Sequence, residues 1–492
     1  SLEKASELLN ATQKNFVNVE FTGISFQDST VEPGDIFFAF PGAKVHGAQF
    51  IGSAASRGAV AVLTDSEGAE LSQQIPTLIV KNVREAGAIL ASHFYRDPIR
   101  EMQSIGVTGT NGKTTCSHWL AQAFTALCRQ SAVVGTLGNG LLSNLSKTSN
   151  TTPDAIVLHG LLADYLAQKA KVVAMEVSSH GLDQGRVNGV AFDVAVFTNL
   201  TRDHLDYHGD MQAYGNAKKK LFAWDGLKTA VLNRDDAFGA KLAAELSAQG
   251  KSVMTYGLNK DFAGENDIAV NSMQLTDAGM CLDVTTPIGE ATLSANVIGQ
   301  FNAYNLLAVL ATLLASDVAL KDAVKALSNI KPVAGRMQQC GGGEHPLIVV
   351  DYAHTPDALE QVLKSLSEQL APNSQLICVF GCGGDRDKGK RPLMGKVSSS
   401  LASRVIVTSD NPRGESAKSI IQAVMALLAP IALFPDELLM QVLMAAGLPP
   451  GVINFVPGES VAISRAVIDD PRLAGVHFTG STAVFNSLWR DV

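Results

Sequence analysis

The chain carries short, almost wholly apolar runs that end in polar turns. The clearest are 172–175, 194–197, 347–350, 376–380 and 405–408. Runs of this length and continuity are typical of strands that are buried on both faces of a parallel sheet. The longest apolar stretch, 306–315, is too short to span a bilayer and predicts a buried helix.

The spacing of these runs divides the chain into three parts. Residues 1–100 alternate short apolar runs with turns, whereas a regular strand–helix rhythm begins near residue 105. A second alternation of predicted strands and helices starts after Pro332, with a linker near 328–336. We therefore predict an α/β fold of three domains. They are a small N-terminal α/β domain (1–100), a central domain with a P-loop ATPase-like parallel sheet (101–332) and a C-terminal Rossmann-like α/β domain (333–492).

Composition narrows the class of protein. The net charge of −8 argues against a general nucleic-acid binder. No apolar run reaches ~18 residues, so no membrane insertion is expected, and the first residues do not resemble a signal peptide. The six cysteines show no metal-type pairing, which suits a reducing, cytoplasmic compartment. Cys378 and Cys382 share a strand-to-loop segment, where simple burial explains them better than a redox role.

The most informative motif lies at 105–115, which read Ile-Gly-Val-Thr-Gly-Thr-Asn-Gly-Lys-Thr-Thr. An apolar strand runs into a glycine-rich turn and then into a helix that begins near Gly112, so backbone amides can approach a polyphosphate. Lys113 supplies a charge for the outer phosphates, and Thr114 supplies a hydroxyl for Mg²⁺. The motif predicts binding of ATP or GTP, although Val107 stands where a standard P-loop has its first glycine.

Polar residues follow the predicted strands, where open α/β sheets bind ligands. Glu176 follows 172–175, and Asn199, Asp203, His204, Asp206 and His208 follow 194–197. A carboxylate and an imidazole at neighbouring strand ends could hold Mg²⁺ beside the phosphates. Taken singly, His204 is better explained as a hydrogen-bonded loop histidine, and Glu176 could be a charge at a helix N-terminus.

A run of three lysines occupies 218–220. Such a run is most simply a solvated helix face. Because successive helical residues are about 100° apart, however, the three side chains fan around the helix, and one of them can face inward.

Together with motifs further along the chain, these residues resemble the Mur ligase family, which builds the peptide stem of peptidoglycan. The matching motifs are Gly106-x-x-Gly109-x-x-Gly112-Lys-Thr-Thr115, Asn150-Thr-Thr-Pro153, Glu176-Val-Ser-Ser-His180, Thr198-Asn-Leu-x-x-Asp-His-Leu-Asp206, Asn233-x-Asp-Asp236, Gly299-x-Phe-Asn302-x-x-Asn305, Gly335-Arg336 and Asp351-Tyr-Ala-His354. The irregular glycine spacing is the family's own. The likeness runs from about residue 20 to about residue 428.

The resemblance implies an ATP-driven ligase with Mg²⁺ as cofactor. By it, ATP is bound by Gly109, Thr110, Asn111, Gly112, Lys113, Thr114, Thr115, Asn302, Arg336 and Asp351. The implied Mg²⁺ ligands are Thr114, Glu176, His204 and Lys218, with Lys218 converted to a carbamate by CO₂. Catalysis is assigned to Lys113, Lys218, His204 and His354, the last as a candidate to assist removal of a proton from the attacking amine.

The resemblance also implies a nucleotide-linked substrate, UDP-MurNAc-L-Ala-D-Glu. The residues that match its binding positions are Ser29, His46, Asn150, Thr151, Thr152, Ser178, Gln184 and Arg186. One position departs from the family pattern, since Thr30 stands where an arginine usually follows Asp-Ser. Without the family, Ser178, Gln184 and Arg186 would be explained by ordinary loop capping.

Within the family the chain is similar to the branch that adds meso-diaminopimelate. The match covers 381–394 (Gly-Cys-Gly-Gly-Asp-Arg-Asp-Lys-Gly-Lys-Arg-Pro-Leu-Met) and the turn Asp410, Asn411, Pro412 and Arg413. It implies that Arg386 and this turn bind the incoming amino acid. Meso-diaminopimelate differs from lysine by a second carboxylate, and a guanidinium suits a carboxylate. The reaction implied is amide formation through an acyl phosphate, by a chain that we expect to be a monomer.

The end of the chain departs from the family pattern. From about residue 437, the segments 447–458 and 477–481 resemble a piece of an aldehyde dehydrogenase of the pyrroline-carboxylate type. The Gly-Lys-Gly-His-Glu loop that usually helps to hold diaminopimelate does not occur in this sequence. The ~60 residues are too few for a full domain of that fold, and we infer no NAD binding from them.

Three other functions remain open from the sequence. A folylpolyglutamate synthase would share the nucleotide motifs but not the turn at 410–413 or the Asp28-Ser29 segment. An NAD-dependent dehydrogenase rests on the tail alone, because no Gly-x-Gly-x-x-Gly fingerprint follows a strand. A nucleotide-binding module without turnover would follow if the unusual tail abolishes activity.

Overall fold

The structure is a computed structural model. It describes residues 1–427 apart from 43–44, 73–74, 149, 260–263, 265, 277–278, 342–346, 369 and 371–373. The unusual segments at 447–458 and 477–481 lie outside the described residues. Within the described part, no helix is long and apolar enough to cross a bilayer.

The N-terminal part is built on a five-stranded sheet in the order β1-β5-β4-β3-β2. Strands β2 to β5 run parallel, and β1 pairs with β5 in the antiparallel sense. The strands are β1 (Thr12–Lys14), β2 (Gly23–Ser25), β3 (Asp35–Phe38), β4 (Ala61–Thr64) and β5 (Thr77–Ile79). The helices are α1 (Leu2–Leu9), η1 (Asp28–Thr30), η2 (Gly47–Phe50), α2 (Ile51–Ser56), α3 (Ser66–Leu71) and α4 (Val83–Phe94). Every residue of β3 and β4 is buried, as expected for a sheet covered on both faces.

The central part holds an eleven-stranded sheet in the order β16-β15-β14-β13-β12-β11-β6-β10-β7-β8-β9. Its middle, from β14 to β7, is parallel, and hairpins at each end add antiparallel strands. The strands are β6 (Gln103–Thr108), β7 (Ser131–Gly135), β8 (Gly138–Leu141), β9 (Asn144–Ser146), β10 (Val172–Glu176), β11 (Val194–Phe197), β12 (Thr229–Asn233), β13 (Val253–Gly257), β14 (Asp267–Thr276), β15 (Gly279–Thr286) and β16 (Gly289–Ala295). The antiparallel edges were not anticipated from the apolar runs, because strands with one solvated face alternate instead.

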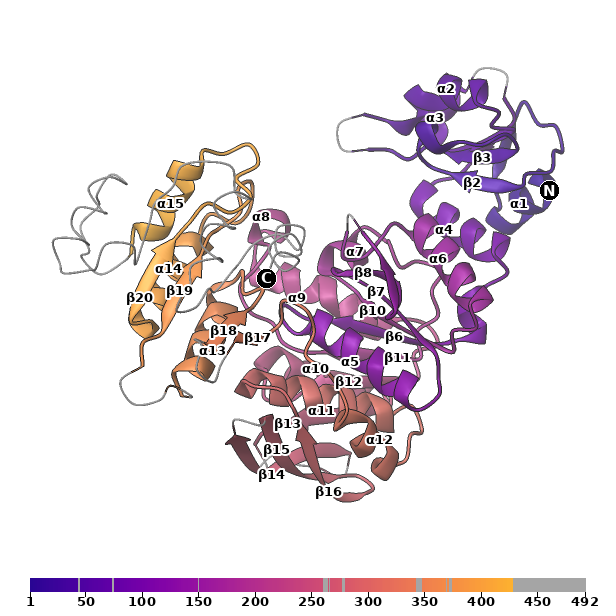
Figure 1. Cartoon of the computed structure of the whole chain (residues 1–492). Coiled ribbons are helices and arrows are strands. Elements are labelled where there is room, and N and C mark those ends of the chain that lie inside the picture. Colours follow the sequence, from indigo (N-terminus) through magenta and orange to yellow (C-terminus); the bar gives the residue numbers. More distant parts are fainter. Residues whose placement is uncertain are drawn as a thin grey trace.

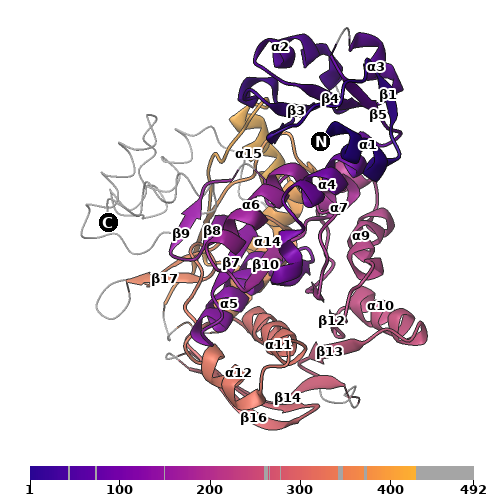
Figure 2. The same ribbon diagram turned by 90° about the vertical axis from the view of Figure 1, so that its right-hand side faces the viewer.

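Helices cover both faces of this sheet. They are η3 (Pro98–Glu101), α5 (Lys113–Ala126), α6 (Ala155–Ala167), α7 (Ser179–Asp183), α8 (Leu205–His208), α9 (Met211–Lys219), η4 (Lys220–Ala223), α10 (Ala237–Ala248), α11 (Gln300–Leu314) and α12 (Leu320–Leu327). The prediction of a buried helix at 306–315 is confirmed by α11, whose residues from Asn305 to Leu313 are all buried. Figure 2 shows α11 and α12 beside the antiparallel strands β14 and β16, and α4 and α6 next to the N-terminal sheet.

The C-terminal part has two small sheets among its described residues. Strands β17 (Gln338–Gly341) and β18 (Leu347–Val350) are antiparallel, whereas β19 (Ile377–Phe380) and β20 (Arg404–Val407) are parallel. The helices α13 (Pro356–Ser367), α14 (Lys390–Leu401) and α15 (Ala417–Met425) pack in sequence on one another. Figure 1 shows these orange and yellow elements on one side of the central sheet, and the indigo N-terminal sheet at its far end.

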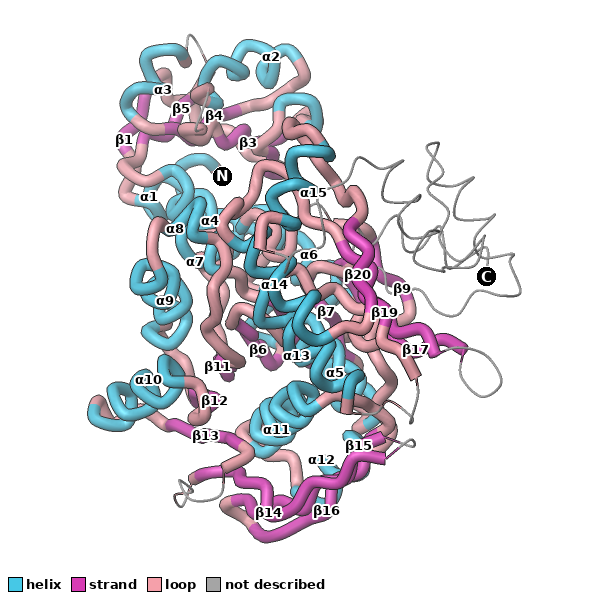
Figure 3. Tube along the Cα trace, turned by 90° about the vertical axis from the view of Figure 1, so that its left-hand side faces the viewer, coloured by secondary structure: helices cyan, strands magenta, loops and turns pink. Residues whose placement is uncertain are grey.

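The order of strands in the central sheet brings the carboxyl ends of three strands together. Strands β10, β6 and β11 are neighbours and run parallel, so their carboxyl ends open at one edge of the sheet. Figure 3 shows α13 and α14 next to this edge. Ligands of open α/β sheets bind at such an edge, which is therefore where the candidate site is expected.

Candidate active site between the central and C-terminal parts

The glycine-rich turn between β6 and α5 has the backbone of a phosphate-binding loop. Gly109 has φ 148° and Gly112 has φ 86°, both in the region that favours glycine. A Cβ at Gly112 would lie 2.5 Å from Asn305 Oδ1, and one at Gly109 would collide with the Thr198 hydroxyl. The helix begins at Lys113, as predicted, so its free N–H groups face the loop.

Lys113 lies folded back over this loop. Its Nζ donates to the carbonyl oxygens of Gly109, at 2.9 Å, and of Thr110, at 2.8 Å. Burial lowers the pKa of Lys113, while the carboxylates of Glu176 and Asp203 raise it. The ammonium therefore lies at the point where an anion would enter.

Glu176 is the acceptor for three groups around the loop. The Thr114 hydroxyl donates to it at 2.9 Å, and Thr136 donates through its backbone N–H at 2.7 Å and its hydroxyl at 3.1 Å. Arg336, from the linker before β17, donates to Thr114 Oγ1 at 2.9 Å, and its guanidinium stacks on the Tyr352 ring. A buried carboxylate, a hydroxyl and a guanidinium thus meet beside the phosphate-binding loop.

Only one lysine of the 218–220 run faces inward, as the helical fan predicted. Lys218 is 1 % exposed, whereas the Lys219 and Lys220 side chains are 42 % and 49 % exposed. Lys218 Nζ donates to the Gly109 carbonyl at 2.8 Å and lies 4.2 Å from the centre of the Tyr214 ring. Burial lowers the pKa of Lys218 well below its usual value, and the Lys113 ammonium lowers it further.

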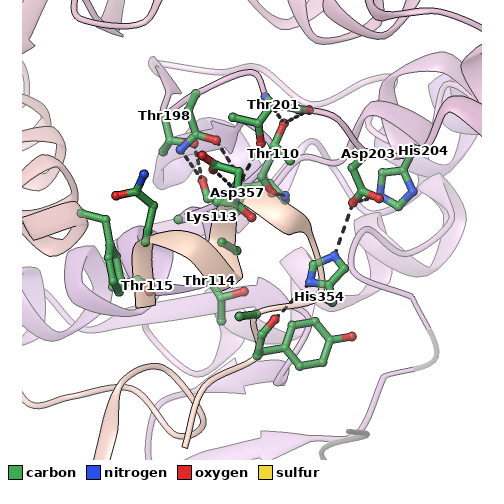
Figure 4. A pocket seen from close by; sticks show the side chains of 18 of the residues that line it. Thr110, Lys113, Thr114, Thr115, Thr198, Thr201, Asp203, His204, His354 and Asp357 are labelled. Atoms are coloured by element: carbon green, nitrogen blue, oxygen red, sulfur yellow. Dashed lines mark hydrogen bonds and ion pairs between the residues drawn. The ribbon is translucent and has the colours of Figure 1, made fainter. Parts of the chain in front are cut away.

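Asp203 connects the two halves of the site. Its carboxylate lies 3.3 Å from His204 Nε2, 3.3 Å from His354 Nε2 and 3.5 Å from Lys390 Nζ, the last two from the C-terminal part. Figure 4 shows Asp203 between the two imidazoles. Burial raises the pKa of Asp203, but His354, Lys390 and His204 outweigh it, and the net shift is downward.

His204 and His354 differ in which of their ring nitrogens can bind a ligand or accept a proton. Burial lowers the pKa of His204 to about 3, so its ring is neutral and can act as a ligand. His354 Nδ1 lies 3.0 Å from the Tyr352 carbonyl while Nε2 faces Asp203, so both nitrogens already meet acceptors. A role for His354 as a proton acceptor requires that one of these contacts be released.

These groups line one cavity of about 660 Å³. The central part supplies Thr110 to Thr115, Glu176, His204 and Lys218, and the C-terminal part supplies Arg336, Asp351, His354, Arg386, Asp410 and Arg413. A cavity of this volume is in the range of small-molecule sites. The phosphate-binding loop and the predicted amino-acid arginines therefore face the same space.

Asn302 lies differently from the other predicted nucleotide residues. Its amide is buried, donating to the Ile298 carbonyl at 2.7 Å and accepting from Asn305 Nδ2 at 3.0 Å. Asn305, one turn further along α11, lines the cavity, and Asn302 is not among its lining residues. Asp351 accepts from the backbone N–H of Met337 at 2.8 Å and thereby holds the end of the linker.

Four of the predicted substrate-binding residues form a cluster beside β10. The Thr152 hydroxyl and Ser178 Oγ are 3.1 Å apart, Arg186 donates to the Thr152 carbonyl at 2.9 Å, and Gln184 accepts from Arg186 Nη2 at 2.7 Å. Asn150 is exposed, and Thr151 Oγ1 lies 3.0 Å from Thr136 Oγ1. Of these residues, Thr151 and Ser178 reach the cavity.

The two predicted N-terminal contacts lie outside the cavity. Ser29 is exposed in η1, and Thr30 bonds within its own turn to the Gln27 carbonyl at 3.0 Å. His46 uses both ring nitrogens internally, since Nδ1 accepts from the Ala48 N–H at 3.0 Å and Nε2 faces Asp65 at 3.1 Å. Ser29 is thus open to a ligand, and the His46 ring is held by its own domain.

Residues 381–389 and the turn after β20 pack against each other. Arg413 has φ 49° and donates to the Gly384 carbonyl at 2.6 Å, and the Gly384 N–H donates to the Asn411 carbonyl at 2.9 Å. Arg386, Asp410 and Arg413 line the cavity, but Asn411 and Pro412 do not. Two guanidinium groups from separate loops therefore reach the same space.

The residues fit a magnesium–nucleotide only in part. Glu176 and Thr114 present hard oxygen donors 2.9 Å apart beside the loop, and Mg²⁺ commonly takes one or two carboxylates plus phosphate oxygens. Within the described chain, no three histidine, cysteine, aspartate or glutamate side chains are grouped as a metal site. An unmodified Lys218 donates to a carbonyl and does not fit as a ligand.

Several residues that line the site were not predicted to belong to it. Tyr214 lies under Lys218 and shares a contact of 3.2 Å between its hydroxyl and Thr110 Oγ1. From the C-terminal part, Asp357 accepts from Asn111 Nδ2 at 3.2 Å in the loop, and Lys390 Nζ lies 3.5 Å from Asp203. Asn305 lines the cavity. The sequence carries a local signal for two of them, the i, i+3 spacing of Asn302 and Asn305 and the i, i+4 spacing of Tyr214 and Lys218, whereas Lys390 and Asp357 contact segments far from them in the chain.

Family models match the three parts of the chain in order. The Mur ligase family catalytic domain matches 20–95, the Mur ligase middle domain matches 107–313, and the Mur ligase glutamate ligase domain matches 335–445. The last match runs beyond the residue near 428 where the likeness was expected to end. An aldehyde dehydrogenase family model matches 430–491, in agreement with the predicted resemblance and outside the described residues.

Individual proteins agree with the family models. The chain is 51 % identical over 399 residues to UDP-N-acetylmuramoyl-L-alanyl-D-glutamate–2,6-diaminopimelate ligase of Chromobacterium violaceum, covering 80 % of each protein. A solved structure of a ligase of the same name has a TM-score of 0.65 at 32 % identity, covering 97 % of this chain and 96 % of that one. MurF ligase of Thermotoga maritima in complex with ADP has a TM-score of 0.63 at 17 % identity, covering 95 % and 96 %, and shows the shared fold. This chain belongs to the Mur ligase family.

Proposed function

We propose that the protein is an ATP-dependent ligase that joins meso-diaminopimelate to the D-glutamate of UDP-MurNAc-L-Ala-D-Glu in peptidoglycan synthesis. One observation carries this proposal: the phosphate-binding loop and the arginines Arg386 and Arg413 line one cavity. The names of the relatives support the choice of substrates. The first step transfers the γ-phosphate of ATP to the substrate carboxylate, and the second replaces phosphate by the amine.

The first step must overcome repulsion between a carboxylate and a polyphosphate. Lys113 and Arg336 supply positive charge at the loop, in a part-buried site where such charge is more effective than in open solvent. When bound, Mg²⁺ would neutralise phosphate charge, held by Thr114 and Glu176. Phosphoryl transfer depends on such positioning and charge neutralisation.

Lys218 is proposed to act as a carbamate. Burial disfavours its ammonium form, and the neutral amine is the form that adds to CO₂, releasing one proton. In the unmodified side chain, Lys218 Nζ lies 2.8 Å from the Gly109 carbonyl oxygen. The carbamate is an anion, so its carboxylate must point away from that oxygen. The neutral ring of His204 would share the metal with the carbamate.

In the second step the incoming amine attacks the acyl carbon, phosphate leaves, and the amine loses a proton. Arg386 and Arg413 are proposed to bind the carboxylate that lysine lacks, because a guanidinium pairs with a carboxylate through two parallel hydrogen bonds. His354 is a candidate to assist proton removal once it is released from Asp203.

The remaining assignments follow from this reaction. We propose that residues 1–100, 101–332 and 333–492 are the domains for the UDP substrate, ATP and the amino acid, which the order of the family matches supports. Ser29, Asn150, Thr151, Thr152, Ser178, Gln184 and Arg186 are proposed to bind the UDP substrate. Because the reaction consumes ATP and a nucleotide-linked substrate, we place it in the cytoplasm.

The test is phosphate release from ATP in the presence of UDP-MurNAc-L-Ala-D-Glu. Release is expected with meso-diaminopimelate and is expected to be much slower with lysine. Phosphate release with lysine but not with meso-diaminopimelate would refute the amino-acid assignment. No phosphate release with either amino acid would favour a nucleotide-binding protein without turnover.

A further inference from the structure

Two separate loops carry the arginines proposed to recognise the amino acid. Arg386 lies in residues 381–389 after β19, and Arg413 lies in the turn after β20. Each loop leaves the sheet from a different strand, so strand pairing alone does not set the distance between the two guanidinium groups. The bonds of Gly384 with Asn411 and Arg413 join the loops at one point, and a second contact would fix their relative orientation.

Glu415 supplies that contact. Two residues after Arg413, its carboxylate accepts from Arg391 Nη1 at 3.0 Å and Nη2 at 2.7 Å, and from the backbone N–H of Asp385 at 2.6 Å. Lys388 Nζ lies 3.3 Å from the same carboxylate. The partners of Glu415 therefore lie on both sides of Arg386.

The Arg391–Glu415 pair is buried enough to be rigid. The Arg391 side chain is 3 % exposed and that of Glu415 is 15 % exposed, whereas Lys388 is 71 % exposed. The hydrogen bonds from Arg391 lower the pKa of Glu415 to about 2, so the pair stays charged. A bidentate pair of this kind adds geometric specificity as well as energy. Neither residue is among those that line the cavity.

We propose that Arg391 and Glu415 are positioning residues for amino-acid specificity, which set the spacing of Arg386 and Arg413 and so favour an incoming amino acid with a second carboxylate. The inference rests on the proposed function and deepens it. The Gly414 N–H, which donates to Asp385 Oδ2 at 2.9 Å, also joins the two loops, but this bond is exposed, whereas the Arg391–Glu415 pair is largely buried.

The test compares the wild type with Glu415→Gln, Glu415→Asp and the double variant Arg391→Gln/Glu415→Gln, which leaves no lone buried charge. KM is measured for each of the three substrates, together with the ratio of kcat/KM for diaminopimelate over lysine. We expect KM for diaminopimelate to rise about tenfold or more, the ratio to fall, and KM for ATP and for the UDP substrate to stay unchanged. Glu415→Asp should recover part of the loss.

A matched control is Glu360→Gln, which removes an exposed carboxylate paired with Lys364 at 2.6 Å in the same domain. It should change none of these values. Variants with all three KM values raised together, or with diaminopimelate KM and selectivity unchanged, would overturn the inference. A wild-type enzyme that adds no diaminopimelate would overturn the proposed function as well, so the two failures are distinguishable.

Discussion

Gly384 packs directly against the backbone of the turn at 410–413, and Gly384→Ala should push the two amino-acid loops apart. An added Cβ would lie 2.5 Å from the carbonyl carbon of Pro412 and 3.2 Å from its Cα. The Cβ would lie closer still to the Pro412 carbonyl oxygen, and ordinary Cβ contacts begin at 3.4 Å, so the loops must separate by more than about 1 Å. The shift would also strain the hydrogen bond of 2.9 Å from the Gly384 N–H to the Asn411 carbonyl.

The kinetic effect follows from the displacement. Arg413 donates to the Gly384 carbonyl at 2.6 Å, so its guanidinium moves with the loop. A misplacement of ~1 Å can cost ~100-fold in rate. We therefore expect kcat/KM for diaminopimelate to fall by about 10- to 100-fold, which corresponds to roughly 1.4–2.8 kcal/mol of transition-state stabilisation.

The assay varies diaminopimelate at saturating ATP and UDP substrate, with calorimetric binding of an ATP analogue as the check on folding. The analogue should bind as it does to the wild type. Gly52→Ala is the matched control, because a Cβ on this residue of α2 meets nothing within 4 Å, and alanine favours a helix by about 1 kcal/mol. Wild-type kcat/KM in a folded Gly384→Ala protein would refute the reasoning.

Three further predictions concern the phosphate-binding loop and the core. Lys218→Met cannot form a carbamate, so phosphate release should fall by about 100-fold or more without rescue by bicarbonate, and the intact wild type should show the mass of added CO₂; activity in the variant would contradict the carbamate. Thr114→Val keeps the side-chain shape but removes the hydroxyl shared by Glu176 and Arg336, so calorimetry should show Mg²⁺–ATP binding weakened by about 1–2 kcal/mol, and unchanged affinity would contradict this. Burial and Arg336 lower the pKa of His118 to about 4, below its unfolded value of about 6.5, so the free energy of unfolding should fall by about 3 kcal/mol between pH 6.5 and pH 4. His118→Gln should lose that part of the pH dependence, and equal slopes in denaturant titrations of the two proteins would contradict the assignment.

Much of the fold could be predicted because it depends on local pattern. The segment 105–115 contains a strand, a turn and a helix start in one continuous stretch, and the structure places Lys113 and Thr114 as that stretch requires. The inward orientation of Lys218 follows from helix geometry in the same way. The β14–β16 and β7–β9 hairpins were not predicted, because their pairing adds antiparallel strands to a sheet whose buried strands dominate the apolar pattern.

The pattern of residues along the chain could not predict contacts between distant segments. Asn302 was predicted to bind ATP, and the packing of α11 turns its amide to the Ile298 carbonyl and places Asn305 at the cavity. The partners of Asp203 come from residues 204, 354 and 390, and no spacing in the chain relates them. The pairing of Arg391 with Glu415 depends likewise on how the start of α14 meets the turn after β20.

By itself, the sequence determined the nucleotide-binding loop, the three α/β parts and the family. Each of these depends on the pattern of residues that are neighbours along the chain. Only the tertiary structure decided that the loop and the two arginines line one cavity, that Lys218 reaches the Gly109 carbonyl, and that the Glu415 carboxylate contacts Asp385 and Arg391. These features depend on burial and on distances between segments up to about 300 residues apart, and only a folded chain brings such segments into contact.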